Sequence, residues 1–372
     1  MQKRANADSG AAVWDQPLTP HFSHVLDHVR WMAAFVVMAG HVRNNLFVPY
    51  HRIEAPTAAV KIFYTFTNLQ NEAVICFFVL SGFLIGGKLY RYHAQGRVPV
   101  WRYIVDRLTR LNIVLLPAVA VTFAVGAIGA CPAISTSEWV GSLLYVQHVL
   151  TAVPACNAPL WSLTNEFWYY LIGLLIVLLP RYRVLALIGL SLSLAVLAND
   201  SLNRENVLVY FGVWGLGTIL IRYDWVAKVD LGLWFAFAFF VAALAISRSH
   251  IADGIYVIRD YAIAVGLFLI LLAYRRRTET RMVLPRFGHF MAGFSYSLYL
   301  LHWPIIMTVR MVLARTGFAE RLAPGDAHVY GIYTATCALC LVVSLVLAFV
   351  TERNTGRVRQ LILATRSLVE RA

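Results

Sequence analysis

Ten apolar runs divide this sequence, and each is long enough to cross a lipid bilayer when tilt and short ends are allowed for. The bilayer core holds no water to bond backbone N–H and C=O groups, so each run satisfies them within a helix. The runs therefore predict an all-α, polytopic transmembrane helical bundle of about ten helices. We place the spans at roughly 24–47, 67–90, 111–130, 162–179, 184–199, 206–221, 230–247, 257–273, 291–314 and 328–351.

The composition agrees with a membrane protein. Hydrophobic residues make up 59% of the chain and charged residues only 14%. Soluble domains are about 45–50% apolar and about 25% charged. The net charge of +13 would suggest a nucleic-acid partner in a soluble protein. Here the basic residues lie between apolar runs, so orientation in the membrane explains them and we expect no nucleic-acid partner.

The distribution of basic residues predicts the orientation of the bundle. Most of the 32 Lys and Arg lie in alternate connecting segments and in the terminal tails, which the positive-inside rule assigns to the cytoplasm. We expect one integral-membrane domain over 1–372, with 1–22 and 354–372 as cytoplasmic tails. The segment 91–110 mixes charged and aromatic residues, which favours a helix lying among the lipid headgroups.

The first span contains an unusual polar stripe. Residues 26–45 read LDHVRWMAAFVVMAGHVRNN, and Asp27, Arg30, His41 and Asn45 fall within about 60° of one another on a helix. Arg30 and His41 lie about 16 Å apart along the axis. Such a stripe favours a cavity or a partner helix over lipid. The alternative is that Arg30 is a juxtamembrane positive charge and His41 an interfacial histidine.

The fourth span carries a carboxylate, within PLWSLTNEFWYY at 159–170. Glu166 is predicted to lie about one turn below the outer surface, at a depth similar to that of His41. A Glu inside a span is a functional candidate, and a His–carboxylate pair is a usual general-base arrangement. The alternative is a structural ion pair between Glu166 and Arg43.

The second span contains CFFVLSGFLIGG at 76–87. Gly82 and Gly86 have the spacing of helix-packing motifs, so tight packing is the simpler interpretation. Ser81 could donate a hydrogen bond to a ligand between helices.

Two arginines stand at the inner end of the third span. Arg107 and Arg110 are three residues apart and share a helix face. Two guanidinium groups at a membrane–cytosol boundary are suited to binding phosphate oxygens. The alternative is ordinary positive-inside arginine in contact with lipid headgroups.

The ninth span contains SYSLYLLHWPI at 295–305. Ser295, Tyr299 and His302 share one face, and Pro304 is expected to bend the helix just beyond His302. This pattern favours a cavity lining, although interhelical hydrogen bonding explains it as well.

The outer loop 131–160 contains two cysteines, Cys131 and Cys156, and no Lys or Arg. Thiols confined to an oxidising compartment are expected to pair, and this bond would fasten the start of the fourth span near Trp161 and Glu166. The alternative is that Cys131 is simply buried at the end of the third span. Metal-ligand spacings, nucleotide loops and serine-nucleophile elbows are missing, so we expect no metal site and no tightly bound cofactor.

With these motifs in hand, the chain resembles acyltransferase family 3, the bacterial integral-membrane acyltransferases that decorate surface glycans. The resemblance covers nearly the whole chain and rests on five motifs in order: LDHVRWMAAFVVMAGH, FFVLSGFLIGG, the paired arginines, LWSLTNEFWYY and SYSLYLLHWPI. The chain departs from many relatives at TERN (351–354), where no Pro follows the Glu closely, and around the fourth-span glutamate.

The resemblance implies a multi-pass enzyme of the bacterial inner membrane that acylates a hydroxyl near the outer face. The implied donor is a cytosolic acyl-coenzyme A, such as acetyl-CoA. The acyl group is expected to be acetyl, with succinyl as the alternative. The implied partners are a carbohydrate acceptor, such as exopolysaccharide or lipopolysaccharide, and membrane lipid.

For the site itself, His41 is expected to take the acceptor proton, with Glu166 orienting it or balancing its charge. Arg30 is expected to polarise the thioester carbonyl or to steady the donor, and Asp27 to hold Arg30. Direct transfer and an acyl-histidine intermediate both fit. The predicted donor-binding residues are Arg107, Arg110, Ser81, Gly82, Trp161, Ser162, Tyr299 and His302.

Two other function classes are alternatives. A proton-coupled transporter of acyl groups or polar solutes would use the same ionisable residues as a proton relay. An internal repeat would favour it, and the sequence shows none. A purely structural subunit would not need four ionisable groups at membrane depth.

Overall fold

The computed structural model describes residues 18–178, 207–221, 232–249, 256–275, 277, 284–318 and 321–369. Within these ranges the chain is helical, with two isolated β-bridges and no strand, so the predicted all-α class is confirmed. The predicted span at 184–199 lies outside the described residues.

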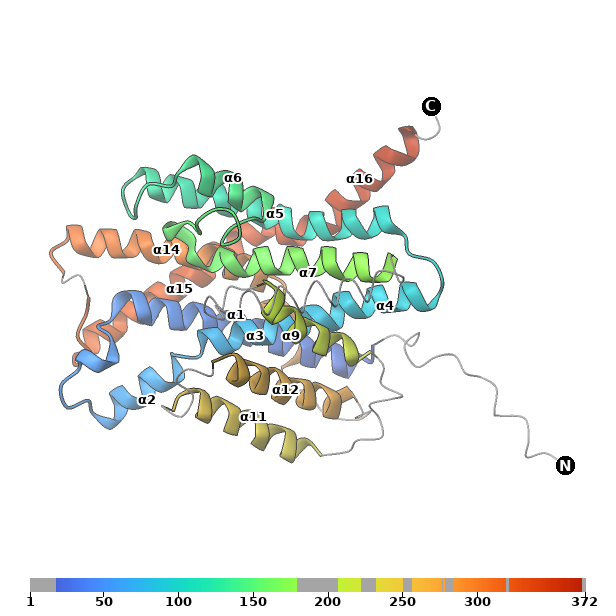
Figure 1. Cartoon of the computed structure of the whole chain (residues 1–372). Coiled ribbons are helices and arrows are strands. Elements are labelled where there is room, and N and C mark those ends of the chain that lie inside the picture. The colour runs from blue at the N-terminus through green and yellow to red at the C-terminus, as the bar shows by residue number, and fades with distance from the viewer. Residues whose placement is uncertain are drawn as a thin grey trace.

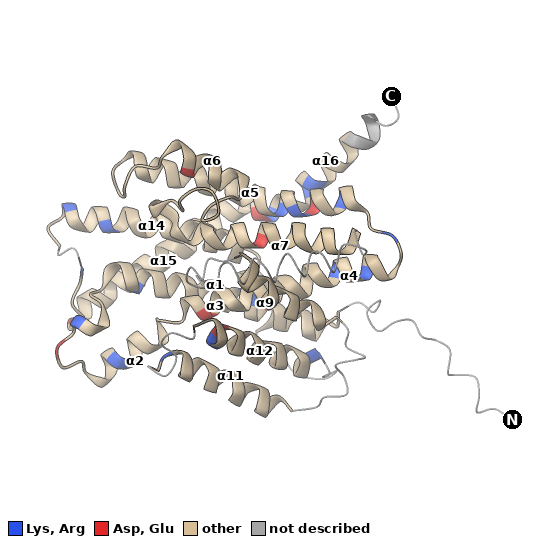
Figure 2. Ribbon diagram, viewed as in Figure 1, with Lys and Arg blue, Asp and Glu red and all other residues tan. Residues whose placement is uncertain are grey.

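The helices run side by side across Figure 1, with α2 at one end of the bundle and α4 and α16 at the other. Figure 2 shows that most Lys and Arg in view lie toward these two ends. The α-helices are α1 (Pro20–Leu46), α2 (Ala58–Phe66), α3 (Gln70–Ser81), α4 (Gly87–Ala94), α5 (Val100–Ala127), α6 (Thr136–Leu144), α7 (Trp161–Leu178), α9 (Val207–Ile219), α11 (Leu233–Ser247), α12 (Tyr256–Arg275), α13 (Pro285–Ala292), α14 (Ser295–Arg315), α15 (Ala327–Val350) and α16 (Thr355–Val369). Shorter turns are η2 (Tyr50–Arg52), η3 (Gly82–Gly86), η4 (Ala155–Leu160) and η7 (Glu352–Asn354).

Six segments of the described chain are long and apolar enough to cross a membrane, which makes this a multi-pass membrane protein. They are Ala58–Ala94, Val100–Ala127, Ala155–Leu178, Tyr256–Arg275, Ser295–Arg315 and Ala327–Thr365. Helices α9 and α11 are apolar but shorter. Helix α1 is long, but its polar stripe makes it less apolar than these six. The count of ten and the cytoplasmic termini stay predictions.

Several predicted boundaries differ from the observed ones. Helix α5 begins at Val100, so the paired arginines lie inside a long helix. A separate headgroup helix over 91–110 is therefore wrong, because the amphipathic residues continue directly into the apolar run. The second span is α3, a π-helical turn at Gly82–Gly86 and α4 in one continuous rod.

Helix α1 occupies the centre of the described bundle and packs against α3, α13, α14 and α15. Its start is fixed by local chemistry: Thr19 Oγ1 accepts the Phe22 N–H at 3.2 Å, and Pro20 supplies a helical φ at the first position. The buried residues of α1 include Ala33, Ala34 and Gly40, whose small size lets neighbouring helices approach closely.

Two glycines bring α9 against the second span. A Cβ on Gly82 would collide with the backbone of Trp214, and one on Gly217 would collide with Val79. The packing interpretation of the glycine motif therefore accounts for Gly82.

The outer loop is tied to the bundle at two points. A disulfide joins Cys131 to Cys156, the pair expected from the sequence, with Cα atoms 5.6 Å apart. The next residue, Asn157, is fully buried and donates from Nδ2 to Thr122 Oγ1 and to the Leu300 carbonyl. Turn η4 is thereby held between α5 and α14, and α7 starts from a fixed position.

Candidate functional site

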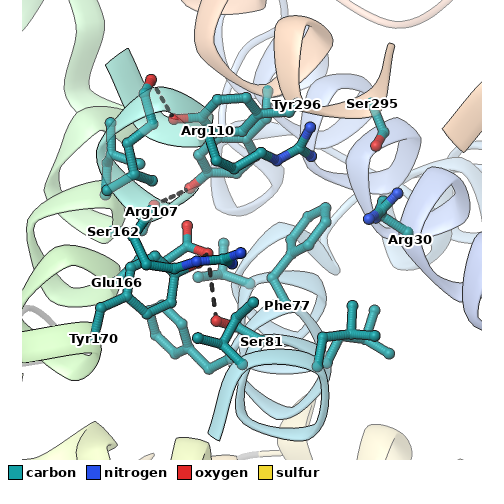
Figure 3. A pocket seen from close by; sticks show the side chains of 18 residues that line it. Arg30, Phe77, Ser81, Arg107, Arg110, Ser162, Glu166, Tyr170, Ser295 and Tyr296 are labelled. Atoms are coloured by element: carbon teal, nitrogen blue, oxygen red, sulfur yellow. Dashed lines mark hydrogen bonds between the residues drawn. The ribbon is translucent and has the colours of Figure 1, made fainter. Parts of the chain in front are cut away.

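Helices α1, α3, α5, α7 and α14, with η3, enclose a cavity of about 860 Å³, including its open mouth. Figure 3 shows the Arg110 side chain extending toward the side where Arg30 lies, with Phe77 between Arg30 and Glu166 in this view. The lining is mostly apolar but contains three arginines and one carboxylate, a combination suited to an elongated anionic ligand. The lining residues are Arg30, Val74, Phe77, Phe78, Leu80, Ser81, Leu84, Ile85, Arg107, Arg110, Leu111, Ser162, Leu163, Glu166, Tyr170, Ser295, Tyr296 and Tyr299.

One of the three arginines is neutralised by the protein. Arg110 Nη2 lies 3.2 Å from Glu352 Oε1, and its guanidinium carbon lies 5.1 Å from the centre of the Tyr296 ring. The other oxygen of the buried Glu352 accepts hydrogen bonds from Ser297 N and Oγ, both at 3.0 Å. Glu352 thus caps the start of α14 and holds Arg110 at the cavity wall.

The other two arginines that line the cavity have no ion-pair partner among the described residues. Neither Arg30 nor Arg107 forms an ion pair or a side-chain hydrogen bond with any described residue, and the Nε of Arg107 is buried without a partner. The guanidinium of Arg107 lies over the Tyr170 ring at 5.7 Å. Helix α5 therefore presents one balanced and one unbalanced guanidinium, one turn apart.

Glu166 stands in the same cavity and is held by neutral donors. Its Oε1 accepts hydrogen bonds from Tyr170 Oη and, at 3.3 Å, from Ser81 Oγ. Ser81 Oγ in turn accepts the indole N–H of Trp214 at 3.2 Å. This chain fixes the carboxylate in position without neutralising it.

The expected pair between His41 and Glu166 is wrong. His41 Nδ1 lies 2.8 Å from Nε2 of His302, and the two ring planes differ by 9°. Contact between two side chains requires a similar depth in the bilayer, but depth does not decide which helices face one another. Helix α1 packs closely on α14, whereas Glu166 on α7 turns toward Ser81 and Tyr170.

The expected pair between Asp27 and Arg30 is also wrong, and so is the alternative pair between Glu166 and Arg43. Asp27 Oδ2 bonds Nδ1 of His289 at 2.9 Å and forms no ion pair with Arg30, because α13 packs beside this end of α1. Arg43 bonds Thr67 and Asn68 at the start of α3, so Glu166 is not its ion-pair partner.

The predicted donor-binding residues divide into two groups. Ser81, Ser162 and Tyr299 line the cavity with Arg107 and Arg110, and Ser162 Oγ lies 2.6 Å from Tyr299 Oη. Gly82, Trp161 and His302 are not among the lining residues.

The residues outside the cavity are used in packing. Gly82 meets the backbone of Trp214. The Trp161 ring packs edge-on against Phe78 at 6.1 Å. His302 is fully buried against His41, and its ring centre lies 6.0 Å from that of Tyr299, so the histidine pair adjoins the cavity wall.

Sequence reasoning missed three residues of this cavity region: Tyr170, Tyr296 and Glu352. Tyr170 could have been found, because it stands four residues after Glu166 and shares its helix face. Tyr296 of α14 and Glu352 of η7 both contact Arg110 of α5, and no spacing along the chain reveals contacts between such distant segments.

Comparison with known proteins gives one family and one relative. The family model described as an acyltransferase domain matches residues 23–351. Acyltransferase MdmB of Streptomyces mycarofaciens is 32% identical over 155 residues, which is 39% of this chain and 37% of that protein. This chain therefore matches little more than a third of that relative's length. No solved structure matches the chain.

Proposed function

Because this chain belongs to the acyltransferase family whose domain model covers residues 23–351, we propose that it is a membrane O-acyltransferase using an acyl-coenzyme A donor. The observation that carries the choice of donor is the cavity with two unbalanced guanidinium groups, Arg30 and Arg107. Charge inside a helical bundle is costly unless it meets an opposite charge, and the phosphates of coenzyme A supply one.

The length of α1 supports a donor with a long arm. Arg30 lines the cavity, and His41 lies eleven residues further along the same helix, about 16 Å away. A donor with phosphates at Arg107 and Arg30 therefore needs an extended apolar arm to bring its thioester to His41. Coenzyme A carries such an arm, and the apolar wall at Phe77 suits it.

In the proposed reaction, His41 takes the proton of the acceptor hydroxyl as the hydroxyl oxygen attacks the thioester carbonyl carbon. The C–O bond forms, the C–S bond breaks, and the proton passes to the leaving sulfur. Arg30 steadies the donor. Direct transfer and an acyl-histidine intermediate both fit this arrangement.

The finer identity follows the family. We propose acetyl as the acyl group, with succinyl as the alternative, and a hydroxyl of a surface or exported glycan as the acceptor. The enzyme would act in a bacterial inner membrane, taking its donor from the cytosol and keeping both termini there.

The test uses the full-length protein in nanodiscs. Labelled acetyl-CoA is added with a panel of saccharides, and free coenzyme A thiol and labelled saccharide are measured; succinyl-CoA is run in parallel. We expect saturable donor binding and acceptor-dependent thioester cleavage, both weakened in Arg107→Ala. Absence of binding and cleavage with both donors would refute the proposal. Uptake of solute into proteoliposomes without thioester cleavage would favour the transporter.

A further inference from the structure

His41 and His302 form a hydrogen-bonded chain that ends on a backbone carbonyl. His302 Nδ1 lies 3.0 Å from the carbonyl oxygen of Leu298, one turn earlier in α14. His302 Nε2 lies 2.8 Å from Nδ1 of His41. The ring centres are 5.1 Å apart with planes 9° apart, so the rings meet edge to edge and the hydrogen bond lies close to their planes.

The Leu298 carbonyl determines which ring nitrogen of His302, and in turn of His41, carries the proton. A carbonyl oxygen only accepts, so His302 Nδ1 carries the proton of this bond. In neutral His302 the lone pair is then on Nε2, and His41 must donate to it from Nδ1. Neutral His41 is thereby left with its lone pair on Nε2, an atom with no hydrogen-bond partner among the described residues.

The surroundings hold both rings in this arrangement. His302 is fully buried, and Cys340 Sγ contacts its carbonyl oxygen at 3.8 Å. The Trp303 ring stands at 84° to His41 with centres 4.9 Å apart, and its indole N–H donates to the Ala155 carbonyl at 3.0 Å. The loop 131–160, through Ala155, thus holds the Trp303 ring against His41.

We propose that His302 is a positioning residue that fixes the tautomer of His41 and leaves Nε2 as the basic atom. The proposal rests on the proposed function only for its kinetic consequence. When His41 takes a proton at Nε2, its Nδ1–H to His302 becomes a charge-assisted bond, which stabilises the imidazolium. A neutral imidazole does this without placing a second full charge in the membrane, where a buried carboxylate would be costly.

The first test needs no activity. Nitrogen-15 solid-state NMR of histidine-labelled protein in lipid, assigned with His41→Gln, should show the wild-type His41 protonated on Nδ1. A His41 protonated on Nε2 and bare on Nδ1 in the wild type would overturn the proposal. An inactive wild type showing the expected tautomer would count against the proposed function and leave this assignment standing.

The second test compares three substitutions at one position. His302→Gln places an amide oxygen near the former Nε2 and can still accept from His41, whereas His302→Asn and His302→Phe cannot. We expect kcat to fall on the order of 10²-fold or more in the Asn and Phe variants, with donor KM changed less than about threefold. The kcat of the Gln variant should be at least about tenfold higher than that of the Asn and Phe variants. Equal kcat in the wild type and the Phe variant, or equal losses in Gln and Asn, would refute the positioning role.

Discussion

Two groups of charged side chains lie inside this helical bundle, and they are arranged in opposite ways. Between α3, α11 and α12, Glu72 accepts hydrogen bonds from Ser247 and Arg248. Asp260 accepts from Tyr210 at 2.8 Å in the same region. In the cavity, by contrast, neither Arg30 nor Arg107 forms an ion pair with a described carboxylate, although Glu166 lines the same cavity.

The difference separates structural charges from charges kept for a ligand. Breaking a buried pair leaves an uncompensated charge, so the α3–α11–α12 group is expected to stabilise the bundle. An unpaired guanidinium beside an open cavity can be hydrated until an anionic ligand replaces the water, so it adds little to stability and much to binding. Substitutions in the two groups should therefore affect different measurements.

The largest effect is expected for His41→Ala, which removes the proposed base from the end of the cavity region. Turnover should fall by about 10²–10⁴-fold, while donor affinity changes little. Acceptor-dependent release of coenzyme A thiol measures turnover, and titration of the donor measures donor affinity. His328→Ala, an exposed histidine outside the site, is the matched control. Retention of more than about a tenth of wild-type turnover in His41→Ala would exclude the general-base role.

The next effect should appear in stability alone. Arg248→Ala leaves Glu72, only 2% exposed, without its cation, and should cost about 3–5 kcal/mol of unfolding free energy. Donor affinity of the folded fraction should be unchanged. The double variant Glu72→Gln/Arg248→Ala should recover part of the loss, because the uncompensated charge is gone. Loss of donor affinity in properly folded Arg248→Ala would contradict the claim that this group of charges affects stability and not binding.

A smaller effect is expected at Arg107 and should be measured as binding. Arg107→Ala should weaken acyl-coenzyme A by about 1.5–3 kcal/mol, the usual worth of a charge-assisted hydrogen bond, with no loss of stability. Arg110→Ala should lower both quantities, because it also strips Glu352 of its ion pair. If Arg107→Ala and Arg110→Ala lower the unfolding temperature equally, the ion pair between Arg110 and Glu352 adds no stability of its own.

The sequence predicted the class of fold and the residues of the site better than it predicted their partners. Arg30 and Glu166 are predicted from their charge within apolar spans, and Arg107 and Ser81 from their ability to bind a ligand; all four line one cavity. The partner of His41 could not be predicted, because helix spacing gives depth and face but not the rotation of one helix against another. The side chains that complete the site come from segments far apart in sequence, as the ion pair between Arg110 of α5 and Glu352 of η7 shows.

The smallest effect is expected at the end of the bundle where α4 and α16 lie, because one carboxylate there has two cationic partners. Asp106, 4% exposed, is paired with Lys88 Nζ at 2.9 Å and with Arg359 Nε at 3.5 Å. Both cations are partly exposed, so Lys88→Ala or Arg359→Ala alone should cost less than about 1 kcal/mol.

Removing both cations should cost more than the sum of the two single changes, because only then is the buried carboxylate left without a counter-charge. A double-mutant cycle in thermal unfolding measures this coupling, and acyl-coenzyme A affinity should stay constant throughout. Additive losses of unfolding free energy would mean that water, rather than Lys88 and Arg359, compensates the charge of Asp106. The contrast between paired and unpaired charges would then hold only in the interior of the bundle and not at its ends.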